Sequence, residues 1–362
     1  ISTNSDSEVL LNILAHEISK SKETEPGPDT FFNAVRNTYR RCEGSINVVS
    51  IITDYGLLAF RDRYGIRPLS LGSRVNEDGS KDYMVSSESA AFACSNYELE
   101  RDLQPGEAIF ITFNGDLFSE ICCEDTALTP CLFEFVYFAR PDSIIDGISV
   151  YQARQAMGTK LAEKIKKHIA DDDIDVVIPI PESSITSGVK VAEVLNKEIA
   201  FGFVKNRYVG RTFIMPEQGL RRASVRRKLN PIFDEFKGKN VLLVDDSIVR
   251  GTTMKEIVEM CYKAGAQKVS VASAAPEVVH PNVYGIDMAA KQDLIASGRS
   301  HEEIKDFLGC DNLVYQDLED LVSSVMELNP ELDGVEKSIF DGEYPTNISD
   351  EYLDTLEKAR SM

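Results

Sequence analysis

One segment constrains the fold of this chain more than any other, residues 241–253, which read VLLVDDSIVRGTT. Four apolar residues end abruptly in two carboxylates, Asp245 and Asp246, and Gly-Thr-Thr then begins a helix. A strand that is apolar on both faces is typical of a parallel sheet covered by helices. Ligands of such sheets bind beyond the carboxyl ends of the strands, where this loop lies. The segment therefore predicts a parallel α/β domain with a ligand site at its loop.

The chemistry of the loop favours a phosphorylated sugar. Backbone N–H groups at a helix start, together with hydroxyl side chains, form a cradle for a phosphate. Neighbouring carboxylates accept hydrogen bonds from vicinal sugar hydroxyls and help to hold a divalent cation. We predict that the loop binds a ribose 5-phosphate through Asp245, Asp246, Ser247, Val249, Arg250, Gly251, Thr252 and Thr253. The alternative is a solvated strand end whose carboxylates cap a helix.

The rest of the chain predicts two kinds of structure. Before residue 120, two amphipathic helices are followed by short strands with turns between them, which indicates an antiparallel sheet. Ser5 and Glu8 are expected to form a capping box at the first helix. From Phe133 onward, strand-like apolar runs alternate with helices, which indicates a parallel sheet. The expected divisions are residues 1–128, 129–316 and a C-terminal part, 317–362, of helices and tail.

A second segment, residues 205–228, carries eight basic side chains and one acidic one, a local charge of +7. Its Pro and Gly residues interrupt any regular element, so we expect a long connecting loop whose charge suits a pyrophosphate. A solvated basic face or a nucleic-acid patch is the alternative. Five of its basic residues are predicted to belong to a flexible lid, namely Lys205, Arg207, Arg211, Arg226 and Lys228.

Charge and cysteine content exclude several classes of partner. With 39 basic and 59 acidic residues, the formal net charge is −20, which argues against nucleic acid and anionic membranes as partners. The seven Cys residues are scattered, odd in number and contain no C-x-x-C pair. This pattern predicts reduced thiols and a cytoplasmic protein.

Residues 241–253 resemble the phosphoribosyl pyrophosphate (PRPP) loop of the type I phosphoribosyltransferases. Together with FVYFARPDS at 135–143 and FVKNRYVGRTFI at 203–214, they make essentially the whole chain similar to the amidophosphoribosyltransferase family. The resemblance implies synthesis of 5-phosphoribosylamine from PRPP and glutamine-derived ammonia, with release of pyrophosphate, as the first committed step of purine (IMP) biosynthesis. It also implies a Rossmann-like phosphoribosyltransferase sheet after an α+β glutaminase domain of the Ntn-hydrolase type.

The resemblance assigns further residues. It implies a pyrophosphate loop after the apolar run 176–180, with Ser183, Asp245 and Asp246 near a Mg²⁺ ion, and a tyrosine near PRPP at Tyr137. It implies that residues 205–228 close over PRPP as a lid. A helix-capping role remains open for Ser183. Tyr137 lies in an apolar run that is expected to be a strand, so a role in the hydrophobic core remains open for it.

In the first part of the chain, Asp6 matches the residue that holds the glutamine amino group, although a purely structural role remains open. The family's nucleophilic Cys is not in the printed sequence, so we expect a shortened glutaminase domain, no glutamine hydrolysis and ammonia-dependent synthesis. Cys131 falls where some relatives have one iron–sulfur ligand, but residues 281–285 and 337–342 contain no Cys. We therefore expect no iron–sulfur cluster.

The resemblance also implies feedback inhibition by AMP or GMP and a homotetramer. Two other functions stay open at this point. One is a phosphoribosyltransferase that uses a nucleobase in place of ammonia, and the other is a PRPP-binding regulatory protein that has lost catalysis.

Overall fold

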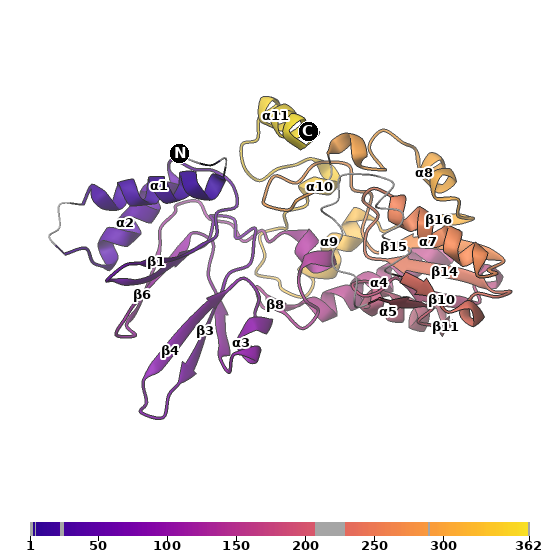
Figure 1. Cartoon of the computed structure of the whole chain (residues 1–362), viewed down its shortest axis with the longest axis horizontal. Helices are drawn as coiled ribbons and strands as arrows, with labels where there is room; N and C mark the ends of the chain where they lie inside the picture. The colour runs from indigo at the N-terminus through magenta and orange to yellow at the C-terminus, as the bar shows by residue number, and fades with distance from the viewer. Residues whose placement is uncertain (1–2, 4, 22–24, 207–228, 289, 361–362) are drawn as a thin grey trace.

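The computed structural model describes residues 3, 5–21, 25–206, 229–288 and 290–360. Figure 1 shows two halves side by side, which we call the N-terminal half (residues 3–121) and the C-terminal half (residues 131–360). Residues 122–130 connect them. None of the helices within these ranges is both long and apolar enough to cross a bilayer.

The N-terminal half consists of a layer of two helices over two antiparallel sheets (Figure 1). The helices are α1 (Asp6–Ser19) and α2 (Pro28–Tyr39). The first sheet has the order β1-β2-β6-β7, from β1 (Val48–Ile52), β2 (Gly56–Phe60), β6 (Glu107–Thr112) and β7 (Leu117–Ile121). The second has the order β4-β3-β5, from β3 (Ser70–Val75), β4 (Lys81–Ser86) and β5 (Glu98–Asp102), with α3 (Ala90–Cys94) after β4.

Alternation along the strands explains these layers. In β2, Leu58 and Phe60 pack against Phe31 and Val35 of α2. The intervening Ala59 belongs to the cluster on the opposite face, where the β3–β4–β5 sheet lies. Successive strand residues point to opposite faces, so one central sheet serves two cores. The expected antiparallel sheet is confirmed, although the sequence analysis missed β3, β5 and β7.

The predicted capping box at α1 is wrong. Ser5 is the N-cap residue, but its side chain makes no capping hydrogen bond. Glu8 Oε2 instead accepts the backbone N–H of Thr3 at 2.6 Å and the Thr3 hydroxyl at 2.6 Å. Thr3 offers the carboxylate two donors, whereas a capping box would offer it one.

The C-terminal half is built on a parallel five-stranded sheet of order β11-β10-β14-β15-β16 (Figure 1). Its strands are β10 (Val176–Pro179), β11 (Glu198–Ile199), β14 (Asn240–Asp245), β15 (Lys268–Ser273) and β16 (Asn312–Tyr315). The helices are α4 (Val150–His168), α5 (Ile185–Leu195), α7 (Thr252–Lys263), α8 (His301–Leu308), α9 (Leu318–Met326), α10 (Ser338–Asp341) and α11 (Asp350–Arg360). Two short hairpins complete it, β8 (Ile144–Ile145) with β9 (Ile148–Ser149) and β12 (Phe203–Lys205) with β13 (Leu229–Pro231).

Both faces of this sheet are covered, as its continuous apolar strands predict. In β14, Val241 and Leu243 pack with Ile257 of α7. Leu242 and Val244 pack on the other face with Leu161 of α4. The β14 strand is therefore buried on both sides and can present polar groups only at its end, where the loop begins.

The expected strand around Tyr137 is corrected by the structure. Residues Glu134–Phe138 form a π-helix, in which the Ala139 N–H donates to the Glu134 carbonyl at 3.0 Å. The i to i+5 bond accommodates one extra residue per turn and occurs frequently at functional sites. Tyr137 is 36% exposed, so it is not a core residue.

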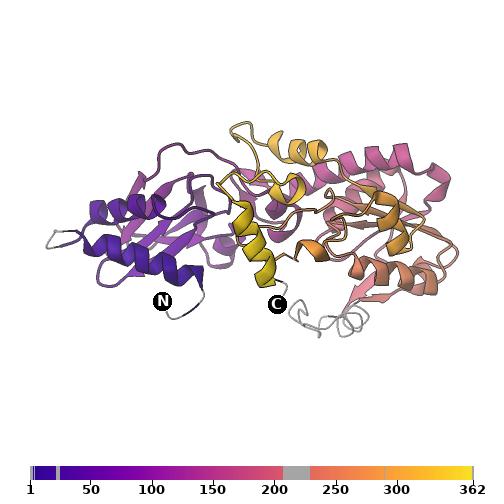
Figure 2. The ribbon, with the colours of Figure 1, turned by 90° about the horizontal axis from the view of Figure 1, so that it is seen from above.

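A hydrophobic cluster at the junction belongs to both halves. It contains Ile66 from the N-terminal half, Phe135 from the π-helix, Leu321 from α9 and Ile339 from α10. Beside it, Arg61 is fully buried and donates to both carboxylate oxygens of Asp146, at 2.7 and 2.9 Å. Figure 2 shows α11 lying over the junction of the two halves.

Candidate functional site

Two loops meet at the carboxyl ends of the central strands. The first follows β14 and runs through residues 246–251 into α7, and the second follows β10 and runs through residues 180–184 into α5. The Ile180 N–H donates to the Val244 carbonyl at 2.9 Å, and the Ser183 hydroxyl donates to Asp246 Oδ2. The structure therefore brings together the two segments that the sequence predicts to bind ribose phosphate and pyrophosphate.

The paired carboxylates lie in a desolvated position. Asp246 is buried, and its Oδ1 accepts the Ser247 hydroxyl at 2.7 Å. Burial raises the pKa of Asp246, against the hydrogen bonds from Ser183 and Ser247 and the nearby Arg154 charge, which lower it. Burial, and then the adjacent Asp246 charge, raise the pKa of Asp245 well above its usual range. Two carboxylates so close favour either a proton or a cation between them.

The backbone of the loop is held in one conformation. Gly251 has φ +72°, and a Cβ there would lie 2.2 Å from Ile295 Cδ1. The Ile295 N–H donates to the Val249 carbonyl at 2.9 Å, and Asp293 Oδ2 lies 3.7 Å from Arg250 Nη2. Residues 293–295 thus fasten the loop from outside. They escaped the sequence analysis because they form no motif.

The helix that follows offers its N-terminus to a ligand. The N-cap residue of α7, Gly251, has no side chain that could cap the helix, and Thr252 and Thr253 in its first turn are exposed. The first N–H groups of a helix have no intrahelical partner, and the helix dipole is positive at this end. A helix start of this kind can bind an anion, which is the property that the sequence predicts for residues 251–253.

Ser183 does not cap a helix. The N-cap residue of α5 is Ser184, whose hydroxyl donates to the Ile180 carbonyl, whereas the Ser183 hydroxyl points to Asp246. Ser183 is thus directed toward the carboxylate pair.

Of the predicted lid residues, only Lys205 can be placed. It ends β12, and its Nζ lies 3.1 Å from Glu182 Oε2 in the loop after β10. Arg207, Arg211, Arg226 and Lys228 lie outside the described residues. Lys205, the last residue of β12, pairs with Leu229, the first residue of β13. The described residues on either side of the predicted lid therefore lie next to each other.

A buried arginine that the sequence analysis missed connects Tyr137 to the carboxylates. Arg154 of α4 is 2% exposed, and it donates to the carbonyls of Phe135 and Ala139 at 2.8 Å each. Its charge acts on Asp246, whose pKa it lowers. A single Arg among the buried apolar positions of α4 was the available signal. The π-helix and the loop after β14 are thus neighbours of one guanidinium.

Two further predicted residues lie apart from these loops. Asp6 is exposed at the first turn of α1, where its Oδ1 accepts the Ser7 N–H at 2.7 Å. Cys131 is buried beside Glu336, and burial raises the pKa of its thiol. The structure therefore does not bring Asp6 together with the residues of the loop after β14.

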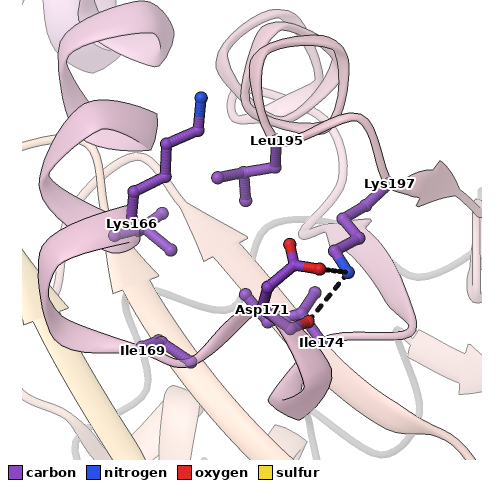
Figure 3. Close-up of a pocket in the computed structure, with 7 residues that line it drawn as sticks. Lys166, Ile169, Asp171, Ile174, Leu195 and Lys197 are labelled. Carbon is purple, nitrogen blue, oxygen red and sulfur yellow. Dashed lines mark hydrogen bonds and ion pairs between the residues drawn. The ribbon is translucent and has the colours of Figure 1, made fainter.

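Two cavities lie away from the site. Figure 3 shows one of about 60 Å³ at the opposite end of the strands, before β10 begins, where Lys197 pairs with Asp171 at 3.0 Å. A cavity of this size is far too small for a sugar phosphate. The other, of about 520 Å³, lies beyond β16 and is lined by Glu277, His301 and Tyr315 among others. Neither includes a residue of the two loops.

Comparison with known proteins agrees with this geometry. Residues 148–278 match the family model of the phosphoribosyl transferase domain. The chain is 54% identical over its whole length to the amidophosphoribosyltransferase of Pasteurella multocida, covering 72% of it, and 53% identical to that of Escherichia coli, with the same coverage of both chains. The yeast Saccharomyces cerevisiae has a relative of the same name, 49% identical over 99% of this chain and 71% of its own length.

Two solved structures are similar over nearly the whole chain. One is the glutamine PRPP amidotransferase of B. subtilis complexed with ADP and GMP, with a TM-score of 0.82 and 37% identity over 97% of this chain and 72% of that one. The other is described as the allosteric regulatory enzyme of purine biosynthesis, with a TM-score of 0.83 and 36% identity over 99% of this chain and 73% of that one. Both similarities extend over the N-terminal half as well as the sheet domain.

Proposed function

This chain belongs to the amidophosphoribosyltransferase family, and from that premise we propose that its two loops bind PRPP and exchange the pyrophosphate for ammonia. The product is 5-phosphoribosylamine, in the first step of purine biosynthesis. The hydrogen bond from Ser183 to Asp246 carries the proposal, because it joins the loop after β10 to the loop after β14. A base-using phosphoribosyltransferase is disfavoured, since relatives match the N-terminal half too.

Each part of the site has a role in this reaction. The N–H groups and hydroxyls of residues 251–253 hold the 5-phosphate, and the carboxylates of Asp245 and Asp246 accept hydrogen bonds from the ribose hydroxyls. Lys205, with the basic residues up to Lys228, closes over the pyrophosphate and absorbs its charge as it leaves. Ammonia is already nucleophilic, so positioning and electrostatic stabilisation supply most of the rate.

The donor set fits a Mg²⁺ ion. Within the described ranges no group of three His, Cys, Asp or Glu side chains is placed to hold a metal. Mg²⁺ typically uses one or two carboxylates together with substrate phosphates, and the adjacent Asp245 and Asp246 with the Ser183 hydroxyl supply oxygen ligands of this kind. Bound there, the ion would neutralise charge on the pyrophosphate.

The remaining assignments rest on the family. The N-terminal half corresponds to the glutaminase domain of the family, and Asp6 would hold the glutamine amino group. Purine nucleotides such as AMP and GMP would inhibit, as the ADP and GMP bound to the B. subtilis relative suggest. A homotetramer in the cytoplasm completes the proposal, and the seven cysteines, all free thiols, support a reducing compartment.

Pyrophosphate release from PRPP with ammonium chloride as nitrogen source tests the proposal without involving glutamine. We expect turnover by the 362-residue chain and at least a hundredfold lower kcat in Asp246→Asn. Asp175→Asn is the matched control. Asp175 accepts the Asn240 N–H at 2.7 Å, at the amino-terminal ends of β10 and β14 and thus at the opposite end of the same strands. Binding of PRPP without any turnover would instead indicate the regulatory protein.

A further inference from the structure

The π-helix that carries Tyr137 is held from both halves of the molecule. From the C-terminal half, Arg154 binds its carbonyls, as described above. From the N-terminal half, Arg67, which lies between β2 and β3, places its Nε 2.8 Å from Glu134 Oε1. The Arg67 guanidinium also lies over the Phe138 ring, 5.4 Å from its centroid. One side chain thus contacts the first and the last residue of the π-helix.

The Arg67 guanidinium compensates the charge of the buried Glu134 carboxylate. Glu134 is 4% exposed, and burial raises the pKa of its carboxyl, while the Arg67 charge lowers it. A buried carboxylate that loses its cation becomes strongly unfavourable, because water cannot replace the partner. The start of the π-helix is therefore fixed to the N-terminal half by this pair.

The contact with Phe138 extends to Tyr137. Their rings meet edge to face, with centroids 5.4 Å apart and an interplanar angle of 85°. An arginine face over an aromatic ring is attractive and directional, so it restrains the ring that it covers. Arg67 therefore restrains Phe138, and Phe138 restrains the orientation of Tyr137.

The N-terminal half also holds the residues that directly follow the π-helix. Glu88 Oε2 accepts the Arg140 N–H at 3.1 Å and the Ser143 hydroxyl at 2.9 Å. The Ile144 N–H donates to the Ser89 hydroxyl at 2.7 Å. Because Val249 of the loop after β14 packs on the hydrophobic cluster that contains Phe135, a displaced π-helix would disturb that loop.

We propose that Arg67 is a positioning residue for ribose transfer, which acts from the N-terminal half by fixing the π-helix and Tyr137 beside the PRPP loop. The proposal rests on the proposed function, because it assigns Arg67 to that reaction. Its consequence is that a change at Arg67, in the N-terminal half, reaches the site of transfer.

The chain offers a matched control for Arg67. Arg74 of β3 makes the same two kinds of contact, with Asp82 Oδ2 at 2.7 Å and with the Tyr97 ring at 4.7 Å. All of these partners belong to the N-terminal half. Arg74→Gln therefore removes an ion pair and a ring contact of the same kinds, at an exposed position and without touching the π-helix.

Ammonia-dependent kinetics should separate the two variants. We expect Arg67→Gln to lower kcat/KM for PRPP at least tenfold, and Arg74→Gln to change it less than twofold. The double variant Arg67→Gln with Glu134→Gln removes the unpaired charge, so its melting temperature should return close to that of the unchanged chain. Its kcat/KM should stay at least tenfold low, because the guanidinium over Phe138 is still missing.

A fluorescent reporter measures the position of the ring itself. The sequence contains no tryptophan, so Tyr137→Trp introduces a single one. We expect its emission maximum and its quenching by acrylamide to change when Arg67→Gln is added, and to be unaffected by Arg74→Gln. A double variant that recovers full activity, or a reporter that does not respond, would overturn the proposal. Absence of turnover in the unchanged chain would count against the proposed function instead.

Discussion

Gly251 is the residue on which the conformation of the PRPP loop depends most directly. Its backbone has φ +72°, which costs an L-residue roughly 1–2 kcal/mol, and Ile295 occupies the space where a Cβ would lie. Either effect would move the N–H groups that are proposed to hold the 5-phosphate.

Gly251→Ala should therefore raise KM for PRPP at least tenfold and lower the melting temperature. Gly298→Ala separates backbone strain from the clash, because Gly298 has φ +76° and no atom near its Cβ position. We expect a loss of stability in both variants but a loss of PRPP affinity in Gly251→Ala alone, measured by steady-state kinetics and thermal melts. Equal KM values in the two variants would contradict the role of Ile295.

At this scale the sequence predicted the residues of the loop but not those that hold it. Asp245, Asp246 and Gly251 belong to one continuous segment, residues 241–253, so a role could be proposed for them from the sequence. Arg154 and Ile295 act through contacts with residues that are distant in the sequence, and only the folded chain reveals them. The π-helix was predicted as a strand because aromatic residues favour strands, and the buried Arg154 and Arg67 contacts outweigh that preference.

At the scale of elements, the β6 and β7 strands show how a buried charge stabilises a sheet. Glu107 of β6 is 2% exposed, and its carboxylate accepts hydrogen bonds from both Arg101 terminal nitrogens, at 2.6 and 2.7 Å. The Ser119 hydroxyl of β7 and the Gln104 N–H donate to the same group at 2.5 and 2.7 Å. Burial raises the pKa of Glu107, but these donors together lower it below the usual value.

A lowered pKa makes this contribution depend on pH. The folded chain holds its proton less tightly than the unfolded chain, so the stabilisation is present above the unfolded pKa and is lost as pH falls through the folded value. Glu107→Gln should cost about 2–3 kcal/mol at pH 7. In urea denaturation this difference should shrink steadily below about pH 4. Glu98→Gln, at an exposed position of β5, should change little at any pH, and a constant difference for Glu107→Gln would refute the pairing.

Element types followed from the sequence where the apolar pattern was long and regular. The helices α1 and α2 before residue 120 and the alternation of apolar strands with helices after Phe133 lie where periodicity predicts them. β5 was missed because its residues, Glu98-Leu-Glu-Arg-Asp, carry four charges over five positions and show no apolar strand pattern. These residues form a strand because they pair with β3, and the local sequence pattern cannot indicate such a tertiary contact.

At the scale of the whole molecule, the ion pair of Arg61 and Asp146 joins the two halves. Arg61 also donates to the carbonyls of Arg67, Leu103 and Gly65, so five hydrogen bonds converge on one buried guanidinium. Asp146 lies between β8 and β9 of the C-terminal half. The pair therefore connects the two halves without exposure to water.

Asp146→Ala should destabilise both halves together, by about 3 kcal/mol, because an uncompensated buried charge remains on Arg61. Hydrogen exchange should show amide protection falling in parallel in β6 and β14. Asp82→Ala, which removes an exposed pair with Arg74, should leave both unchanged. Loss of protection in β6 alone would show that the halves unfold independently.

The hydrophobic cluster shared at the junction limits how such enzymes can be recombined. Ile66 and Tyr64 of one half lie in the same cluster as Val249 of the other. A chimera joined within residues 122–130 would unite surfaces shaped for different neighbours, and the misfit would fall on the substrate loop itself. Exchange of one half between relatives thus requires a matching set of side chains in the other, so the two must be inherited as a unit.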